Sequence, residues 1–148
     1  MTVDKKQLSP CGLYCGVCGI LIAARDNNQK LKEKLAAVYG LKPGDIACQG
    51  CLSDQLFTYC RVCPIRKCAQ EKSLEGCSFC SEFPCQFIND FPYPAGKEVI
   101  MRAVPEWKKL GTEKWVESEL KRYSCTQCHA QLFRGAKRCH SCKEPVAL

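Results

Sequence analysis

Apolar residues recur at helical spacing in several short segments of this chain and never form a long run. In the segment 28–39, leucine and valine side chains lie three or four residues apart with lysines mostly between them, which predicts an amphipathic helix. Gly40 follows it as a helix stop. The apolar segment 20–25 predicts a second short helix. We therefore expect a small protein built from short helices.

The rest of the chain repeats this pattern with interruptions. We expect short helices over 65–72 and 81–89. A longer helix over 96–110 should be interrupted at Pro105, because proline disfavours helical backbone at the residue before it. Thr112 is a suitable N-cap for a further helix. The expected buried face of that helix carries Trp115, Val116 and Leu120.

Cysteine changes this picture, since the chain holds 15 cysteines in 148 residues. Eleven lie between Cys11 and Cys85, four lie between Cys125 and Cys142, and the segment 86–124 has none. Such a density indicates either a disulfide framework or metal sites. The odd count, the CxxC pairs and the lack of a secretory signal in the first residues favour metal sites in a reducing compartment.

The cysteine-free segment predicts how the chain is divided. We expect a cysteine-rich zinc-binding domain over 1–95, a helical linker over 96–122 and a zinc ribbon over 123–148. The longest apolar run, near 19–24, is far shorter than the roughly 20 residues that cross a bilayer. We therefore expect a cytoplasmic protein with no membrane contact.

The strongest chemical motif is the pair of CxxC knuckles in the tail, Cys125-x2-Cys128 and Cys139-x2-Cys142. Two such knuckles place four sulfurs at the corners of a tetrahedron, about 2.3 Å from a zinc ion. The residues between the knuckles suit a short hairpin. The same geometry holds iron in rubredoxin, but the shortness of the motif favours a zinc ribbon. Because four thiolates leave no open coordination position, we predict a structural site.

The first domain contains two further sets of four cysteines. The spacing Cys48-x2-Cys51-x8-Cys60-x2-Cys63 again resembles paired knuckles, and a second site is expected farther along the chain. Cross-brace folds interleave their ligands, so other partitions of these cysteines among the ions stay open. We expect two metal sites here and about three zinc ions in the whole chain. The cysteines of the second site are Cys68, Cys77, Cys80 and Cys85.

Three cysteines remain outside these sets, namely Cys11, Cys15 and Cys18. Their CxxxCxxC spacing is the pattern by which radical S-adenosylmethionine enzymes hold a four-iron cluster, but the chain lacks the alternating strands and helices of the barrel that such chemistry requires. Two interpretations stay open. The triplet holds a [4Fe–4S] cluster with a fourth ligand from elsewhere, or it shares the zinc sites and includes buried free thiols. A low-pKa cysteine here is the one catalytic possibility, and an enzyme is the least favoured class.

Together these motifs resemble a known family. The stretches 11–18, 48–51, 60–68 and 77–85 resemble the bacterial and archaeal domain of unknown function 3795, and the resemblance covers about residues 8–95. It implies a cysteine-rich, zinc-binding domain in a prokaryotic cytoplasm, and it implies no activity. The tail is similar to zinc ribbons in general.

The net charge of +7 suggests a nucleic-acid or acidic partner. Each four-thiolate zinc site carries a charge of about −2, however, so three sites would leave roughly +1. In the tail, Arg134, Lys137 and Arg138 are candidate nucleic-acid contacts, against the simpler interpretation of a solvated basic face.

The sequence as a whole predicts a small metal-rich α (α+β) protein of short helices and zinc knuckles. We expect two metal sites in its first domain and a zinc ribbon hairpin at its end. The leading functional hypothesis is a structural or adaptor module that binds a protein partner. An iron–sulfur redox protein and a nucleic-acid-binding protein are the alternatives.

Overall fold

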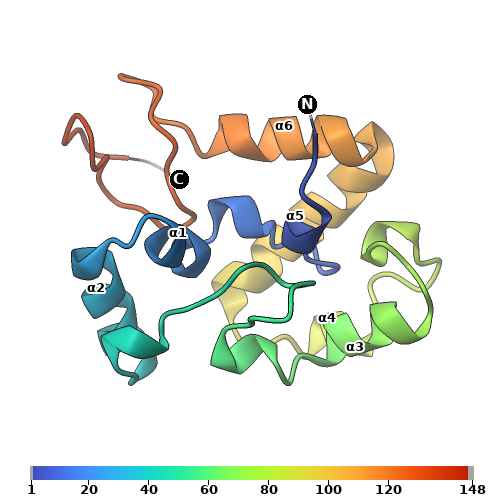
Figure 1. Ribbon diagram of the computed structural model, residues 1–148. Helices are drawn as coiled ribbons and strands as arrows, with labels where there is room; N and C mark the ends of the chain where they lie inside the picture. The colour runs from blue at the N-terminus through green and yellow to red at the C-terminus, as the bar shows by residue number, and fades with distance from the viewer. Residues whose placement is uncertain (1, 147–148) are drawn as a thin grey trace.

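The computed structural model describes residues 2–146 and is mostly helical (Figure 1). Short 3-10 turns connect the helices. The described residues contain no continuous β-ladder; in place of the expected hairpin, the tail has isolated antiparallel bridges joining Ser124 to Gln131 and Arg138 to Pro145. The α-helices are α1 (Gly19–Arg25), α2 (Gln29–Tyr39), α3 (Pro64–Glu71), α4 (Gln86–Asn89), α5 (Pro94–Leu110) and α6 (Thr112–Arg122).

The first two helices form as the hydrophobic pattern predicts. Asn28 caps α2, because its side chain accepts a hydrogen bond of 3.1 Å from the amide of Leu31. Gly40 ends α2 in the left-handed conformation with φ of 67°, a role that glycine fills without steric cost. Ile20 of α1 and Ala36 of α2 lie in one buried cluster, so the two helices pack on each other.

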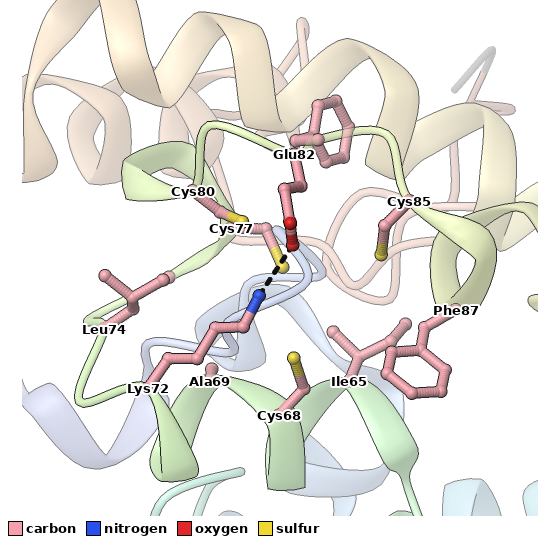
Figure 2. A pocket seen from close by; sticks show the side chains of 12 residues that line it. Ile65, Cys68, Ala69, Lys72, Leu74, Cys77, Cys80, Glu82, Cys85 and Phe87 are labelled. Carbon is pink, nitrogen blue, oxygen red and sulfur yellow. Dashed lines mark hydrogen bonds and ion pairs between the residues drawn. The ribbon is translucent and has the colours of Figure 1, made fainter.

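The helix expected over 81–89 is shorter than predicted. Only α4 is helical, and residues 81–85 form an irregular loop. Pro84 explains the late start, since a proline disfavours helical backbone at the residue before it, here Phe83. The loop carries Cys85, one of the four cysteines of the first domain's second predicted site, which faces Cys68 of α3 in Figure 2.

The prediction of an interruption at Pro105 was wrong, because α5 runs through this residue without a break. A proline inside a helix removes one hydrogen bond and costs about 3 kcal/mol. Pro105 is exposed, whereas Ile100, Val104 and Trp107 are buried. Burying a large apolar side chain contributes about 1.5–3 kcal/mol, so the packing of this face outweighs the cost of the proline.

Two stacked tryptophans join α5 to α6. The rings of Trp107 and Trp115 are parallel within 4°, and their centroids lie 4.3 Å apart. Both side chains are fully buried and belong to one cluster with Tyr14 and Val17 from the start of the chain. The cysteine distribution predicted that the segment 96–122 is a linker. In the structure, this segment contributes the largest side chains of the central core.

Thr112 does not cap α6 as predicted. Gly111 occupies the N-cap position with φ of 80°. The Thr112 hydroxyl instead accepts a hydrogen bond of 2.9 Å from Nε1 of Trp107 and donates one of 2.7 Å to Glu75. The threonine hydroxyl therefore accepts the hydrogen bond of a buried tryptophan and does not accept one from the free amides at the start of α6.

A buried carboxylate also joins these two helices. Glu119 of α6 is completely buried and pairs through both carboxylate oxygens with the guanidinium of Arg102 on α5. Arg102 also donates to Glu106 at 3.1 Å, and Glu106 accepts a further hydrogen bond of 2.7 Å from Ser118. A buried charge of this kind is tolerated only because it is paired and hydrogen-bonded.

The tail lies against the first domain. Figure 1 shows it beside α1. The amide of Arg134 donates a hydrogen bond of 2.7 Å to the carbonyl of Val17. Phe133 lies over Gly19, where a Cβ atom would come within 3.2 Å of its ring. Leu132 donates through its amide to the carbonyl of Tyr123 at 2.7 Å, which ties the tail to the end of α6.

Candidate metal centres

The four tail cysteines form one compact set of ligands. Their sulfur atoms all lie within 4.8 Å of one another. Sγ of Cys125 lies 3.6 Å from Sγ of Cys142, and Sγ of Cys128 lies 3.6 Å from Sγ of Cys139. A tetrahedral ion with metal–sulfur bonds of about 2.3 Å needs sulfurs about 3.8 Å apart. The structure therefore brings the four predicted tail ligands together at the spacing of a single tetrahedral metal ion.

Each half of this site uses the same backbone turn. In both knuckles the amide of the first cysteine donates to the carbonyl five residues later, at 2.9 Å. The residue after the second cysteine is His129 in one knuckle and Lys143 in the other, and both have left-handed backbone, with φ of 63° and 66°. One isolated bridge closes each turn. The site is thus built from two equivalent knuckles that face each other.

Backbone amides point at the sulfurs of these knuckles. Hydrogen bonds from the amides of Cys142 and Ser141 lower the pKa of the Cys139 thiol to about 6. Those from Cys128 and the residue before it lower the pKa of the Cys125 thiol. Hydrogen bonds of this kind favour the charged form of the acceptor, and a metal ion binds cysteine as the thiolate.

The cysteines of the first triplet lie in different packing environments. Cys11 belongs to a cluster with Ile65, whereas Cys15 packs against Cys51 and accepts a hydrogen bond of 3.3 Å from its amide. Cys18 borders that pair and also the α1–α2 cluster. Over residues 2–146, the tail set is the sole group of three or more candidate ligands whose atoms lie mutually within 4.8 Å. The triplet does not form such a set.

The cysteines of the 48–63 spacing are also spread over several clusters. Cys48 and Cys60 pack on the α1–α2 cluster, whereas Cys63 packs on the cluster around Ile65. Cys51 lies with Cys15, as described above. The two knuckles predicted here therefore lack the compact arrangement that the tail knuckles have.

Burial raises the pKa of the thiols in this domain. For Cys51, Cys60 and Cys77, desolvation by burial and the nearby charges of other cysteines raise the pKa to about 12. Burial also raises the pKa of Cys11 and Cys15. Such thiols are neutral near pH 7 unless a metal ion holds them as thiolates. Burial therefore opposes a low-pKa nucleophile at Cys11 or Cys15.

Four cysteines of the first domain surround a cavity (Figure 2). Cys68 points into it from α3, and the other three reach it from the loop between α3 and α4: Cys77, Cys80 and Cys85. The cavity contains roughly 400 Å³ of empty space, part of it open to solvent. These are the four cysteines that the sequence assigned to the second site of this domain.

An ion pair that the sequence does not predict lies at this cavity. Lys72 and Glu82 both line it, and Nζ of the lysine lies 2.8 Å from a carboxylate oxygen of the glutamate. Figure 2 shows the pair spanning the space between α3 and the loop. Ten residues separate the two in the chain, and no motif includes them, so only the fold reveals their pairing.

The basic residues of the tail differ in their surroundings. The guanidinium of Arg134 is half-buried and donates to the carbonyl of Tyr14 at 3.2 Å. Lys137 and Arg138 are exposed, and Arg138 donates to the carbonyl of Lys143 at 2.8 Å. Nucleic-acid binding by this surface stays a prediction, resting on the two exposed side chains.

Comparison with protein families finds one match. The family described as a protein of unknown function, DUF3795, matches residues 7–90, which is more than half of the chain. Neither a curated protein nor a solved structure matches. No helix within the described residues has the length and apolar character needed to cross a membrane.

Proposed function

Because this chain belongs to the DUF3795 family, whose description carries no activity, we propose its function from its geometry. The protein is a metal-stabilised binding module. Its tail is a structural zinc ribbon, and its partner is another protein. The observation that carries this proposal is the tetrahedral spacing of the four tail sulfurs.

Four thiolates complete the coordination of zinc, so the tail ion has no position for water or substrate. The ribbon is also tied to the first domain through Arg134 and Val17 and through the contact of Phe133 with Gly19. A structural zinc ion contributes its binding free energy to folding, and the apparent value in small zinc peptides is about 10–16 kcal/mol. The ion therefore holds the tail in the shape that packs on this domain.

Exposed apolar side chains support a protein partner. Val38 and Tyr59 are 77% and 43% exposed, and Tyr59 packs with Tyr39 and Phe57 in an aromatic cluster. Phe79 is also largely exposed, at 55%. Aromatic residues are enriched in protein interfaces, and exposed apolar patches mark such sites.

The zinc part of the proposal is tested by metal analysis of the full chain. We expect the exchange Cys128→Ala to remove one zinc ion per chain and to lower the unfolding temperature. Cys128 is itself exposed, so the exchange leaves no cavity. The neighbouring exposed Thr126→Ala is the matched control and should change neither quantity. An unchanged zinc content in the Cys128 variant would contradict the structural zinc ribbon.

The partner part is tested in cells with a photoreactive residue in place of Phe79 or Tyr59. We expect defined protein adducts from these positions and none from Lys109, which is exposed on the last turn of α5. The absence of protein adducts from both aromatic positions would argue against a protein partner at these surfaces.

A further inference from the structure

The cavity beside α3 differs from the tail site in how its sulfurs are spaced. Four cysteine sulfurs line it, as many as in the tail, and they point toward a shared space (Figure 2). Yet among the described residues no three of these sulfurs lie mutually within 4.8 Å, whereas all four tail sulfurs do. The same chain therefore holds two four-cysteine arrangements of different width.

The wider arrangement does not suit one zinc ion. Zinc at about 2.3 Å from each sulfur draws the sulfurs to about 3.8 Å from one another. A cubane cluster instead binds each thiolate through a different iron atom, which spreads the thiolates to roughly 6 Å apart. Four cysteines line one cavity, and no three of their sulfurs are close enough for a single ion, which is compatible with the wider ligand spacing of such a cluster.

We propose that Cys68, Cys77, Cys80 and Cys85 bind a [4Fe–4S] cluster in the cavity between α3 and the loop that leads to α4. The proposal concerns a site other than the zinc ribbon and does not depend on it. It also concerns other cysteines than the iron–sulfur alternative left open for Cys11, Cys15 and Cys18, of which Cys11 packs apart from the other two.

The walls of the cavity fit this cofactor. Apart from the cysteines, the lining is mostly apolar and includes the buried side chains of Ile65 and Ala69 and the partly buried Phe83. Apolar walls limit the access of water to the cluster sulfides and tune the reduction potential. The ion pair of Lys72 and Glu82 provides the polar part of the lining.

The ligands are also placed as a cluster site requires. Cys68 is on a regular helix. Cys77 begins a 3-10 turn that packs on α5, and Cys80 is the residue directly after that turn. The amide of Cys77 is fixed by a hydrogen bond of 2.8 Å to the carbonyl of Pro10. Three of the four ligands thus sit on elements whose backbone is held by other parts of the fold, and all four are partly exposed, which leaves a path for iron and sulfide.

The test is iron and sulfide analysis of the full chain, purified without oxygen from cells supplied with iron, and again after incubation with ferrous iron and sulfide. We expect at least four irons and four sulfides per chain and a broad absorbance near 400 nm. Reduction with dithionite should give the electron paramagnetic resonance signal of a reduced four-iron cluster. A chain that carries only zinc under both conditions would overturn the proposal.

Two variants locate the cluster. The exchanges Cys68→Ala and Cys80→Ala should each remove four irons per chain, while Cys128→Ala in the tail should leave the iron content unchanged. The near-ultraviolet circular dichroism of the buried tryptophans reports whether the variants are folded. Folded Cys68 and Cys80 variants that retain all their iron would overturn the assignment to this cavity. If a variant does not fold, the iron content of the wild-type chain still tests whether the protein binds a cluster.

Discussion

The guanidinium of Arg134 donates a hydrogen bond of 3.2 Å to the carbonyl oxygen of Tyr14, across 120 residues of chain. The amide of the same arginine donates to Val17, so one residue makes two contacts with the turn that carries Cys15. Through Arg134, the tail that carries the four-cysteine cluster and the cysteine-rich start of the chain are parts of a single packed unit.

We therefore expect Arg134→Ala to destabilise the protein by about 1–2 kcal/mol, because it removes a charged donor from a half-buried carbonyl. Denaturant unfolding followed by tryptophan fluorescence measures this. Lys137→Ala, at an exposed basic position of the same tail, is the control and should cost less than about 0.5 kcal/mol. Equal effects of the two exchanges would show that the Arg134 contact does not stabilise the fold.

The buried carboxylate of Glu119 gives a larger expected effect. We predict that Glu119→Ala lowers the free energy of unfolding by about 3–5 kcal/mol, because Arg102 then loses its bidentate partner at the interface of α5 and α6. Thermal unfolding of the variant measures this. The exposed Glu117→Ala on the same helix should have little effect. A loss below about 1 kcal/mol for Glu119→Ala would mean that the buried pair contributes little to stability.

The same ion-pair group predicts a dependence of stability on pH. Burial raises the pKa of the Glu106 carboxyl, but hydrogen bonds from Ser118 and Arg102 and the charge of Arg122 outweigh this and hold the pKa below its ordinary value. The stabilisation is thus fully present above the unfolded pKa, about 4.3 for glutamate, and is lost as pH falls through the folded value.

Unfolding temperatures of the wild type and Glu106→Gln, measured from pH 7 down to pH 3, test this. The difference between the two proteins should be largest at neutral pH and should shrink in acid. Loss of metal in acid affects both proteins and cancels in the difference. A difference that is constant with pH would contradict a depressed pKa at Glu106.

The left-handed backbone of His129 predicts a stabilising exchange. A left-handed backbone costs a residue other than glycine about 1–3 kcal/mol, and this exceeds the roughly 0.4–1 kcal/mol that glycine loses through its more flexible unfolded chain. His129→Gly should therefore raise stability by about 1 kcal/mol. Lys143→Gly, at the equivalent place in the second knuckle, should do the same. Thermal unfolding of the zinc-loaded protein measures both exchanges. Gln127→Gly is the control, because its backbone is not left-handed, and it should not stabilise. A loss of stability in both glycine variants would show that these side chains matter more than the backbone.

Much of this structure could be predicted from local patterns. The helical spacing of Leu31, Leu35 and Val38 and the stop at Gly40 predicted α2, because these signals act within a few residues. The tail ligands were predictable for the same reason, since each CxxC pair is closed by one turn. Membership of the DUF3795 family was visible in the spaced cysteine motifs of the first domain.

The rest depends on contacts between distant segments. Neither the continuity of α5 through Pro105 nor the burial of Glu119 follows from local sequence, because a tryptophan face decides the first and an arginine on another helix decides the second. Which cysteines of the first domain lie close together likewise depends on which loops pack against each other in the fold. Cys11 and Cys77 are 66 positions apart, yet the two pack in one cluster.

The stacked pair of Trp107 and Trp115 lies outside the part of the chain that the family model matches, but it packs on residues inside that part. The family match ends at residue 90, but Tyr14 and Val17, which lie inside it, are covered by these two tryptophans, which lie beyond it. In this chain, the stretch that the family model matches therefore does not cover these apolar side chains by itself. Any relative that ends near residue 90 must shield the same apolar side chains by other means, through a different extension or a second polypeptide.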